Sequence, residues 1–191
     1  MSIIKKHMEL KGIAELRQLF ISKGNTREYI KNEFFMQRGQ KHNHLGFILK
    51  GGFRYLGYTS EGNEQIIGYS FENDFVASYS SFQTQQPSNI DAQAISNSTV
   101  LLLTYEDIKA FYDNCGFADL RSKVAETLLN DSNNRLLSLY CDSAEERYQN
   151  LIKNYPDILN LVSLKEIASL IKIRPETLSR IRRRLSFQKN Y

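Results

Sequence analysis

The chain has 191 residues, of which 41% are hydrophobic and 24% charged, with a formal net charge of +4. This length suits one or two domains, each large enough for a hydrophobic core. No apolar run is long enough to span a bilayer and the N-terminus lacks the apolar core of a signal peptide, so we expect a cytoplasmic protein without a membrane partner.

Cys115 and Cys141 are the only cysteines. Two thiols are too few for a four-cysteine iron–sulfur cluster from one chain. In a reducing compartment, buried structural thiols are the default and a disulfide is disfavoured. We therefore predict no cofactor.

Residues 3–20 carry apolar side chains at helical spacing, among them Ile13, Leu16 and Phe20. Charged residues alternate with them. This pattern predicts one amphipathic helix that packs on the following segment and stops near Gly24.

The segment from residue 28 to 105 has the character of β-structure. Seven of the ten glycines lie between Gly39 and Gly68, and we expect each of them near a change of direction. The run S-E-G-N is the best candidate for a hairpin tip. The run N-I-D-A-Q-A-I alternates as a half-buried strand does, and T-V-L-L-L-T reads as a buried strand. Many short strands with glycine turns predict a jelly-roll.

Residues 105–140 return to helical periodicity, with a predicted turn at residues 114–116. The long helix that follows has two apolar stripes. One stripe comprises Phe117, Leu120, Val124 and Leu128, and the other Ala125, Leu129, Leu136 and Tyr140. Such a helix needs two partners, and we expect the strands and a second subunit. The alternative is a core helix of a monomer.

Two capping boxes mark helix starts in the last quarter of the chain. They pair Ser143 with Glu146 and Ser163 with Glu166, so that each side chain satisfies a backbone N–H that the helix start leaves unpaired. Pro156 ends the first helix. A domain boundary is therefore expected near residues 141–143.

The segment from Ser163 to Leu185 predicts two short helices around a tight turn. Pro175 suits the first turn of the second helix. On that helix Leu178, Ile181 and Leu185 share one stripe, and charged residues project from the other side. Arginine can donate two hydrogen bonds to guanine, and glutamate can accept a hydrogen bond from cytosine, so this face suits a major groove. The alternative reading is a solvated helix face.

The positive charge is concentrated at this end. Residues 143–191 contain ten Lys or Arg against five acidic residues, a net +5, which leaves −1 for the remainder. A polyanion would therefore be attracted to the last quarter of the chain.

The runs S-A-E-E-R-Y, Y-P-D-I-L, L-K-E-I-A-S-L and P-E-T-L-S-R-I-R resemble the C-terminal domain of Crp/Fnr-type bacterial transcription regulators. The order of elements along the whole chain matches as well. The resemblance implies an α+β fold: a cyclic-nucleotide-binding-like jelly-roll β-roll in residues 1–115, a central dimerisation helix and hinge in 116–142, and a helix-turn-helix, winged-helix-like DNA-binding domain in 143–191.

The resemblance also implies roles for single residues. The positions that match Glu176 and Arg180 read bases in that family, and Thr177, Ser179 and Pro175 lie beside them. For phosphate contacts we expect Arg174, Arg182, Arg183, Arg184 and Lys165. Pro175 stands where the cyclic-AMP receptor has a base-contacting arginine, which should alter the operator sequence. Lys172 occupies a turn position that is often glycine, so the turn must tolerate a side chain. For the dimer helix we expect Leu120, Val124 and Leu128.

The family's phosphate-binding segment supplies Gly, Glu, Arg and Ser. An ungapped match from Phe75 places Ala77, Ser78, Ser88 and Asn89 there, and no arginine lies between Arg54 and Arg121. A buried phosphate needs a cation or a nest of N–H groups, so we predict that cyclic AMP binding is lost. The candidate effector pocket for another small molecule comprises Tyr69, Phe71, Ala77, Ser78, Ser88, Asn89, Ser132 and Asn133. The favoured interpretation of its aromatic residues is simple core.

Other functional classes are less favoured. His42 and His44 form an H-x-H that is similar to the metal motif of cupin enzymes, but Ile48, Leu49 and Lys50 occupy the region of the expected glutamate. No nucleophile–base constellation is evident, so we predict a non-enzyme without a metal site. A second alternative is a regulator whose basic helix binds a protein.

The sequence thus predicts a homodimeric regulator that binds double-stranded DNA at a palindromic site. RNA polymerase and an unknown small-molecule effector are further candidate partners.

Overall fold

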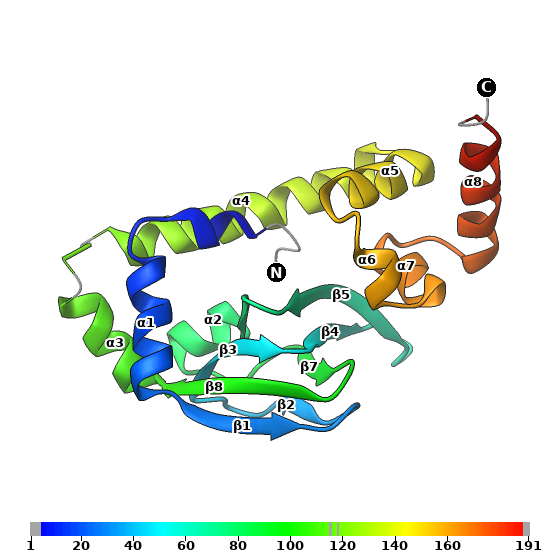
Figure 1. Cartoon of the computed structure of the whole chain (residues 1–191). Helices are drawn as coiled ribbons and strands as arrows, with labels where there is room; N and C mark the ends of the chain where they lie inside the picture. Colours follow the sequence, from blue (N-terminus) through cyan, green and yellow to red (C-terminus); the bar gives the residue numbers. More distant parts are fainter. Residues whose placement is uncertain (1–4, 115, 118, 189–191) are drawn as a thin grey trace. The chain divides into compact units, whose positions relative to one another are not determined.

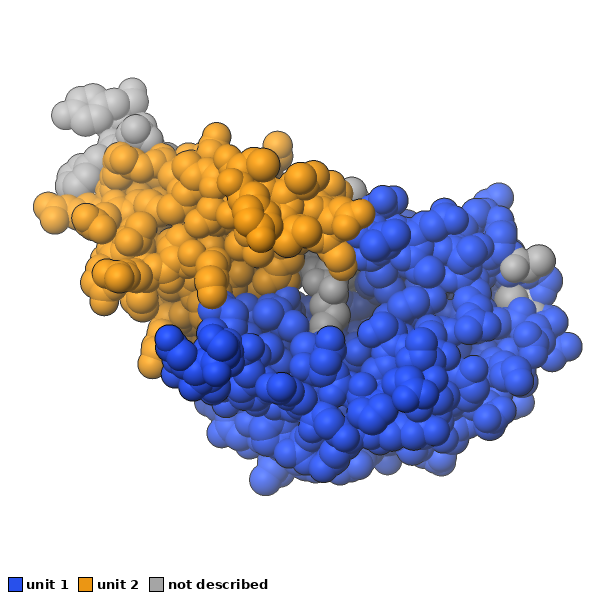
Figure 2. Space-filling model, turned by 180° about the vertical axis from the view of Figure 1, so that it is seen from behind, with its two compact units in different colours: residues 1–131 blue, residues 132–191 orange. Residues whose placement is uncertain are grey.

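The computed structural model describes residues 5–114, 116–117 and 119–188. The chain divides into two compact units, residues 1–131 and 132–191 (Figure 2), and each is treated by itself below. The division lies inside a single long helix. The predicted three-part division, with limits at residues 115 and 142, stays a prediction.

The first unit is built on two four-stranded antiparallel sheets (Figure 1). Its strands are β1 (Asn25–Tyr29), β2 (Phe34–Met36), β3 (His44–Lys50), β4 (Gly52–Tyr58), β5 (Glu64–Phe71), β6 (Phe75–Val76), β7 (Asp91–Ala94) and β8 (Ser98–Thr104). One sheet has the order β1-β8-β3-β6 and the other β2-β7-β4-β5. This arrangement confirms the α+β fold with a jelly-roll-like β-region.

The helices lie before, between and after the strands. In the first unit they are η1 (Lys5–Glu9, a 3-10 helix), α1 (Ile13–Lys23), α2 (Tyr79–Thr84), α3 (Tyr105–Asn114) and the start of α4 (Leu120–Cys141). The second unit contains the end of α4 and then α5 (Ala144–Asn154), α6 (Ile158–Leu161), α7 (Leu164–Leu170) and α8 (Pro175–Gln188). Residues 143–188 contain no strand, so the winged-helix comparison holds for the helices alone. None of the described helices is long and apolar enough to cross a membrane.

The apolar run in β8 is explained by burial on both faces of its sheet. Val100 packs in the layer between the two sheets, whereas Leu101 and Leu103 pack against the helices. Strand β3 is divided in the same way, since Phe47 contacts the helical layer and Ile48 the layer between the sheets. A strand covered on both sides reads as a continuous hydrophobic run, as predicted for T-V-L-L-L-T.

The prediction of one continuous N-terminal helix is wrong. Gly12 has a φ of 94°, a left-handed conformation that glycine adopts readily and that interrupts the helix. The segment therefore forms η1 and α1 as separate pieces. The predicted stop is confirmed, because Gly24 caps the end of α1 and its N–H donates to the Phe20 carbonyl.

The expectation that every glycine between Gly39 and Gly68 marks a turn is also only partly right. Gly62 does lie in the β4–β5 hairpin, with a φ of 82° and an N–H that donates to the Thr59 carbonyl. Gly46, however, lies within β3. A Cβ there would come within 2.7 Å of Val100 and Val76 side-chain atoms, so its role is close packing between layers rather than turning.

Both predicted capping boxes are present. The hydroxyl oxygen of Ser143 accepts from the Glu146 N–H, and the Glu146 carboxylate accepts from the Ser143 N–H at 2.8 Å. The pair of Ser163 and Glu166 repeats this arrangement at the start of α7. Helices α5 and α7 therefore begin where the sequence predicted.

Candidate nucleic-acid interface

Helices α7 and α8 are joined by a tight turn that closes the end of α7. The N–H of Ile173 donates to the Ala168 carbonyl at 2.9 Å, and the N–H of Lys172 donates to the Ser169 carbonyl at 3.1 Å. This pair of bonds is a Schellman motif, which requires a left-handed residue just after the helix. Lys172 has a φ of 58°. The turn therefore does hold a side chain in the conformation that favours glycine.

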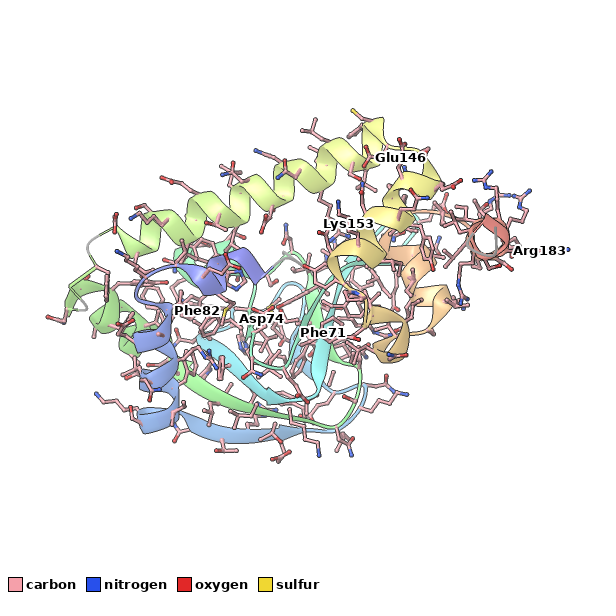
Figure 3. All side chains as sticks on the ribbon, turned by 45° about the horizontal axis from the view of Figure 1, so that its top comes forward. Phe71, Asp74, Phe82, Glu146, Lys153 and Arg183 are labelled. Atoms are coloured by element: carbon pink, nitrogen blue, oxygen red, sulfur yellow. The ribbon has the colours of Figure 1, made fainter. Side chains whose placement is uncertain are left out.

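Helix α8 buries one face and leaves the other open to solvent. Leu178 is 1% exposed and Ile181 5%, and both contribute to the core of the second unit. Glu176, Ser179 and Arg180 are exposed on the other side. Arg183 is exposed too and lies on the same helix (Figure 3). The apolar stripe thus fixes α8 on its unit and turns its polar face outward.

The residues predicted to read bases lie together at the start of α8. Pro175 and Glu176 are exposed in the first turn, and Ser179 and Arg180 follow one turn later. Thr177 is half-buried, and its hydroxyl oxygen accepts from Arg180 Nη2 at 3.5 Å. The arrangement presents two donor- and acceptor-bearing side chains, Glu176 and Arg180, one turn apart on one helix face.

The residues predicted to contact phosphate are less uniform. Lys165, Arg174 and Arg183 are exposed, whereas Arg182 is half-buried at the apolar edge of α8. The guanidinium of Arg184 forms an ion pair with the Glu145 carboxylate of α5. Exposed pairs of this kind contribute only about 0.2–1 kcal/mol, so a phosphate could displace the carboxylate.

Two further arginines of this unit were not singled out from the sequence. Arg135 Nη2 on α4 donates to the Leu170 carbonyl at 3.3 Å, and Arg147 Nε on α5 donates to the Ile171 carbonyl at 2.9 Å. Both acceptors are at the end of α7. No spacing rule could have revealed these contacts, because they join segments more than twenty residues apart.

The candidate effector pocket is only partly brought together. Tyr69 is 1% exposed and stacks on Phe71 with ring centroids 5.5 Å apart. Ser88 is buried and occupied within its own turn, since its hydroxyl donates to the Ile90 carbonyl and accepts from the Ile90 N–H. Ser78 is buried at the start of α2, and Asn89 is exposed.

The other candidate pocket residues do not add a cation. Ala77 is half-buried, and Ser132 and Asn133 are exposed on α4 in the second unit. The buried hydroxyl of Tyr55 receives a backbone hydrogen bond from Ala77 and lies 3.0 Å from the Ser70 hydroxyl. The backbone at Ala77, which the sequence match places in the phosphate segment, thus already has a partner from the protein.

The two histidines of the H-x-H run lie close to each other. Their ring centroids are 5.8 Å apart, and His42 packs on Phe35 at 4.5 Å. Burial, and then the charges of His44 and Arg27, lower the pKa of His42 to about 4. Within the described residues no group of three or more His, Cys, Asp or Glu side chains is arranged to hold a metal ion.

Helix α4 separates its two stripes sharply. Leu120 is 1% exposed and Val124 6%, and both pack with Leu128 and Phe117 against the helical layer of the first unit. The three side chains assigned to the dimer helix, Leu120, Val124 and Leu128, are therefore occupied within their own unit. The second stripe is uncovered: Leu129 is 61% exposed, Leu136 53% and Tyr140 81%.

The two units define a class of protein: a jelly-roll-like β-domain joined through a long helix to a helix-turn-helix. Residues 26–115 match the family model of the cyclic nucleotide-binding domain. A comparison with curated protein sequences finds no match. Among solved structures the chain is similar to FixK2 from Bradyrhizobium japonicum, with a TM-score of 0.76 and 19% identity over 87% of this chain and 86% of that one.

Two other solved structures extend this comparison. The c-di-GMP responsive global regulator CLP of Xanthomonas campestris gives a TM-score of 0.69 at 14% identity, with 92% of this chain and 93% of that chain covered. The catabolite activator protein of Thermus thermophilus gives 0.55 at 19% identity, with 96% and 87% covered. The resemblance to Crp/Fnr-type regulators is thus confirmed at the level of the fold, which the chain shares with these structures over most of its length, and residues 26–115 match the cyclic nucleotide-binding domain model.

Proposed function

We propose that the protein is a sequence-specific DNA-binding transcription regulator of Crp/Fnr type. The observation that carries this proposal is the exposed polar face of α8, anchored from behind by Leu178 and Ile181. Glu176 and Arg180 are the base-reading residues, and Lys165, Arg174 and Arg182–Arg184 supply positive charge for phosphates. The net charge of +5 over residues 143–191 favours a polyanionic partner.

The proposed assembly is a homodimer joined through α4. Its uncovered stripe contains Leu129, Leu136 and Tyr140, flanked by the exposed Leu137 and Leu139. A row of large apolar side chains on one helix is costly in water and is typical of a subunit contact. Two copies of α8 would then enter successive major grooves about 34 Å apart on a palindromic site.

The effector, if the regulator uses one, is proposed to be something other than cyclic AMP. No arginine lies between Arg54 and Arg121, and the backbone N–H of Ala77 already donates a hydrogen bond to the Tyr55 hydroxyl. A cyclic phosphate in that place would lack an arginine partner and would have to compete with Tyr55 for the Ala77 N–H. RNA polymerase is a further proposed partner, as for regulators that activate transcription.

Selection of bound duplexes from a random DNA pool, at two salt concentrations and without added ligand, tests the central proposal. We expect enrichment of a two-fold symmetric site and an affinity that falls steeply as salt rises. If a folded dimer enriches no sequence under any salt condition or with any added nucleotide, the basic helix serves another partner and the proposal is wrong.

Calorimetric titration with cyclic AMP tests the second part. We expect no binding heat up to millimolar nucleotide. A micromolar dissociation constant would show that the β-domain holds the phosphate by contacts other than arginine, and the proposed loss would be abandoned.

A further inference from the structure

The end of α7 leaves backbone carbonyls that the helix itself cannot satisfy. The turn supplies partners for two of them, since Ala168 and Ser169 accept from Ile173 and Lys172. The backbone hydrogen bonds of the turn do not include the next two carbonyls, those of Leu170 and Ile171. Their partners come from other helices.

Two arginines provide those partners. Arg135, from the last two turns of α4, donates Nη2 to the Leu170 carbonyl at 3.3 Å. Arg147, from the first turn of α5, donates Nε to the Ile171 carbonyl at 2.9 Å and Nη1 to the Asp142 carbonyl at 2.6 Å. Asp142 lies in the connection between α4 and α5. The two side chains therefore join α4, the connection and α7.

The electrostatics favour this arrangement. A cation at the C-terminal end of a helix interacts favourably with the partial negative charge of its carbonyls. Partial burial lowers the pKa of Arg135 to about 10, so the half-buried group stays charged at neutral pH. A charge that has lost water depends strongly on the acceptors that replace it.

We infer that Arg135 and Arg147 form an arginine clamp that holds the α7–α8 hairpin in one orientation on the end of α4. They are positioning residues: neither belongs to the exposed face of α8. The inference rests on the proposed function for its consequence, because in a dimer joined through α4 the clamp would set the direction in which each copy of α8 meets DNA, and hence the preferred spacing between half-sites.

A purely stabilising role makes a different prediction. If the arginines only cap α7, their loss lowers the stability of the second unit but leaves the orientation of the hairpin unchanged in the molecules that remain folded. A positioning role requires the orientation itself to loosen. The test therefore has to measure orientation at a temperature where far-UV circular dichroism shows full helicity in every variant.

The first experiment needs no DNA. Nitroxide labels at Asn134→Cys on α4 and at the exposed Ser186→Cys on α8, in a chain whose native cysteines are replaced by serine, report the distance between the end of α4 and the hairpin. The labelled chain is diluted into unlabelled chain so that each dimer carries one labelled copy. We compare R135Q, R147Q, the double variant and, as a control, K153Q at the exposed Lys153 of α5 (Figure 3).

The expected result is a narrow distance distribution for the unsubstituted chain and K153Q, and a broadened or shifted one for R135Q and R147Q, widest in the double variant. R135K should restore part of the narrow distribution, because an ammonium can still donate to a carbonyl. R147K should restore less, since one nitrogen replaces the planar fork that reaches two carbonyls. An unchanged distribution in the folded double variant would overturn the clamp.

The second experiment connects the clamp to DNA. The preferred half-site is presented as inverted repeats whose separation is varied one base pair at a time. We expect the double variant to prefer the same half-site sequence. The ratio of its affinity for the best spacing to its affinity for other spacings should fall by on the order of tenfold. Equal spacing preference in both proteins refutes the positioning role. If the unsubstituted chain binds none of these duplexes, the proposed function fails instead, and the distance distributions alone decide the clamp.

Discussion

Lys172 adopts a left-handed backbone conformation, with a φ of 58°, at the one position of the α7–α8 turn that requires it. This conformation costs an L-residue roughly 1–2 kcal/mol, and glycine escapes most of that cost but loses more freedom on folding. Lys172→Gly should therefore stabilise the second unit by about 0.5–1 kcal/mol, measured by urea denaturation. Lys172→Ala is the matched control: an equal gain would attribute the effect to the lost charge.

Arg180 and Arg183 are both exposed on α8 and carry the same charge, yet they are assigned different tasks. Arg180→Ala should cost roughly 1–3 kcal/mol on the preferred site and relax the preference at one base pair. Arg183→Ala should weaken binding nearly equally on all sequences. Competition binding against a panel of single-base variants checks both. Identical profiles for the two variants would contradict the role assignments.

His42 gives the first unit a predictable dependence on acid. Its pKa is about 4 in the folded chain, below the ordinary 6.5, because burial and then the charges of His44 and Arg27 disfavour the protonated form. As the pH falls, His42 is therefore protonated in the unfolded chain before it is protonated in the folded chain. The contribution of His42 to stability is complete above about pH 6.5 and is lost as the pH falls towards 4.

The variant His42→Phe keeps a ring against Phe35 and removes the titration. We expect the difference in unfolding free energy between the unsubstituted chain and this variant to be constant above about pH 6.5 and to shift against the unsubstituted chain between pH 6.5 and 4. Urea denaturation at several pH values measures it. A difference that stays constant down to pH 4 would show that His42 is not protonated on unfolding.

At the level of elements, the sequence predicted correctly those helix starts that depend only on neighbouring residues. The two serine–glutamate capping boxes place the starts of α5 and α7 because each satisfies backbone N–H groups within four residues of itself. Pro175 marks the start of α8 because the N–H that it lacks would be unpaired in a first helical turn. Gly46 and Gly12 were misjudged for the opposite reason. A glycine needed for close packing and one needed for a left-handed kink look alike until the neighbours are known.

In the candidate site, too, the features set by nearby residues could be predicted and those set by long-range contacts could not. The exposed face of α8 follows from helical periodicity alone, so its residues could be predicted. The contacts of Arg135 and Arg147 with Leu170 and Ile171 are long-range and involve backbone acceptors, which leave no pattern in the sequence. Periodicity also indicated both stripes of α4 but not which partner each one meets: Leu120 and Val124 pack inside the first unit, and their assignment to the dimer contact stays a prediction.

The different burial of the two stripes of α4 predicts opposite results for substitutions on them. Leu136→Asp, on the uncovered stripe, should leave helicity intact and weaken dimerisation by roughly 100-fold or more, since two leucines lose apolar contact per dimer. Leu120→Asp should unfold the first unit, because a carboxylate would replace a side chain that is 1% exposed. Sedimentation and circular dichroism separate these outcomes. A dimer unaffected by Leu136→Asp would remove this stripe from the interface.

At the scale of the whole molecule, charge and apolar surface are distributed for different tasks. Residues 143–191 carry a net +5 and the remainder −1, so attraction to a polyanion is confined to the second unit. The first unit has two buried apolar layers, and the start of α4 packs in one of them. In a dimer each basic residue of the second unit would therefore be present twice.

That duplication can be measured in the salt dependence of binding. Each phosphate contact contributes about 0.9 to the slope of log K against log salt concentration on duplex DNA. Because Arg183 would contact phosphate once in each subunit, Arg183→Ala should reduce the magnitude of the slope by roughly 1.8 on a palindromic site. On a duplex with a single half-site bound by one unit, the reduction should be roughly 0.9. Equal reductions on both duplexes would mean that only one copy of α8 engages DNA, and the two-fold symmetric complex would have to be given up.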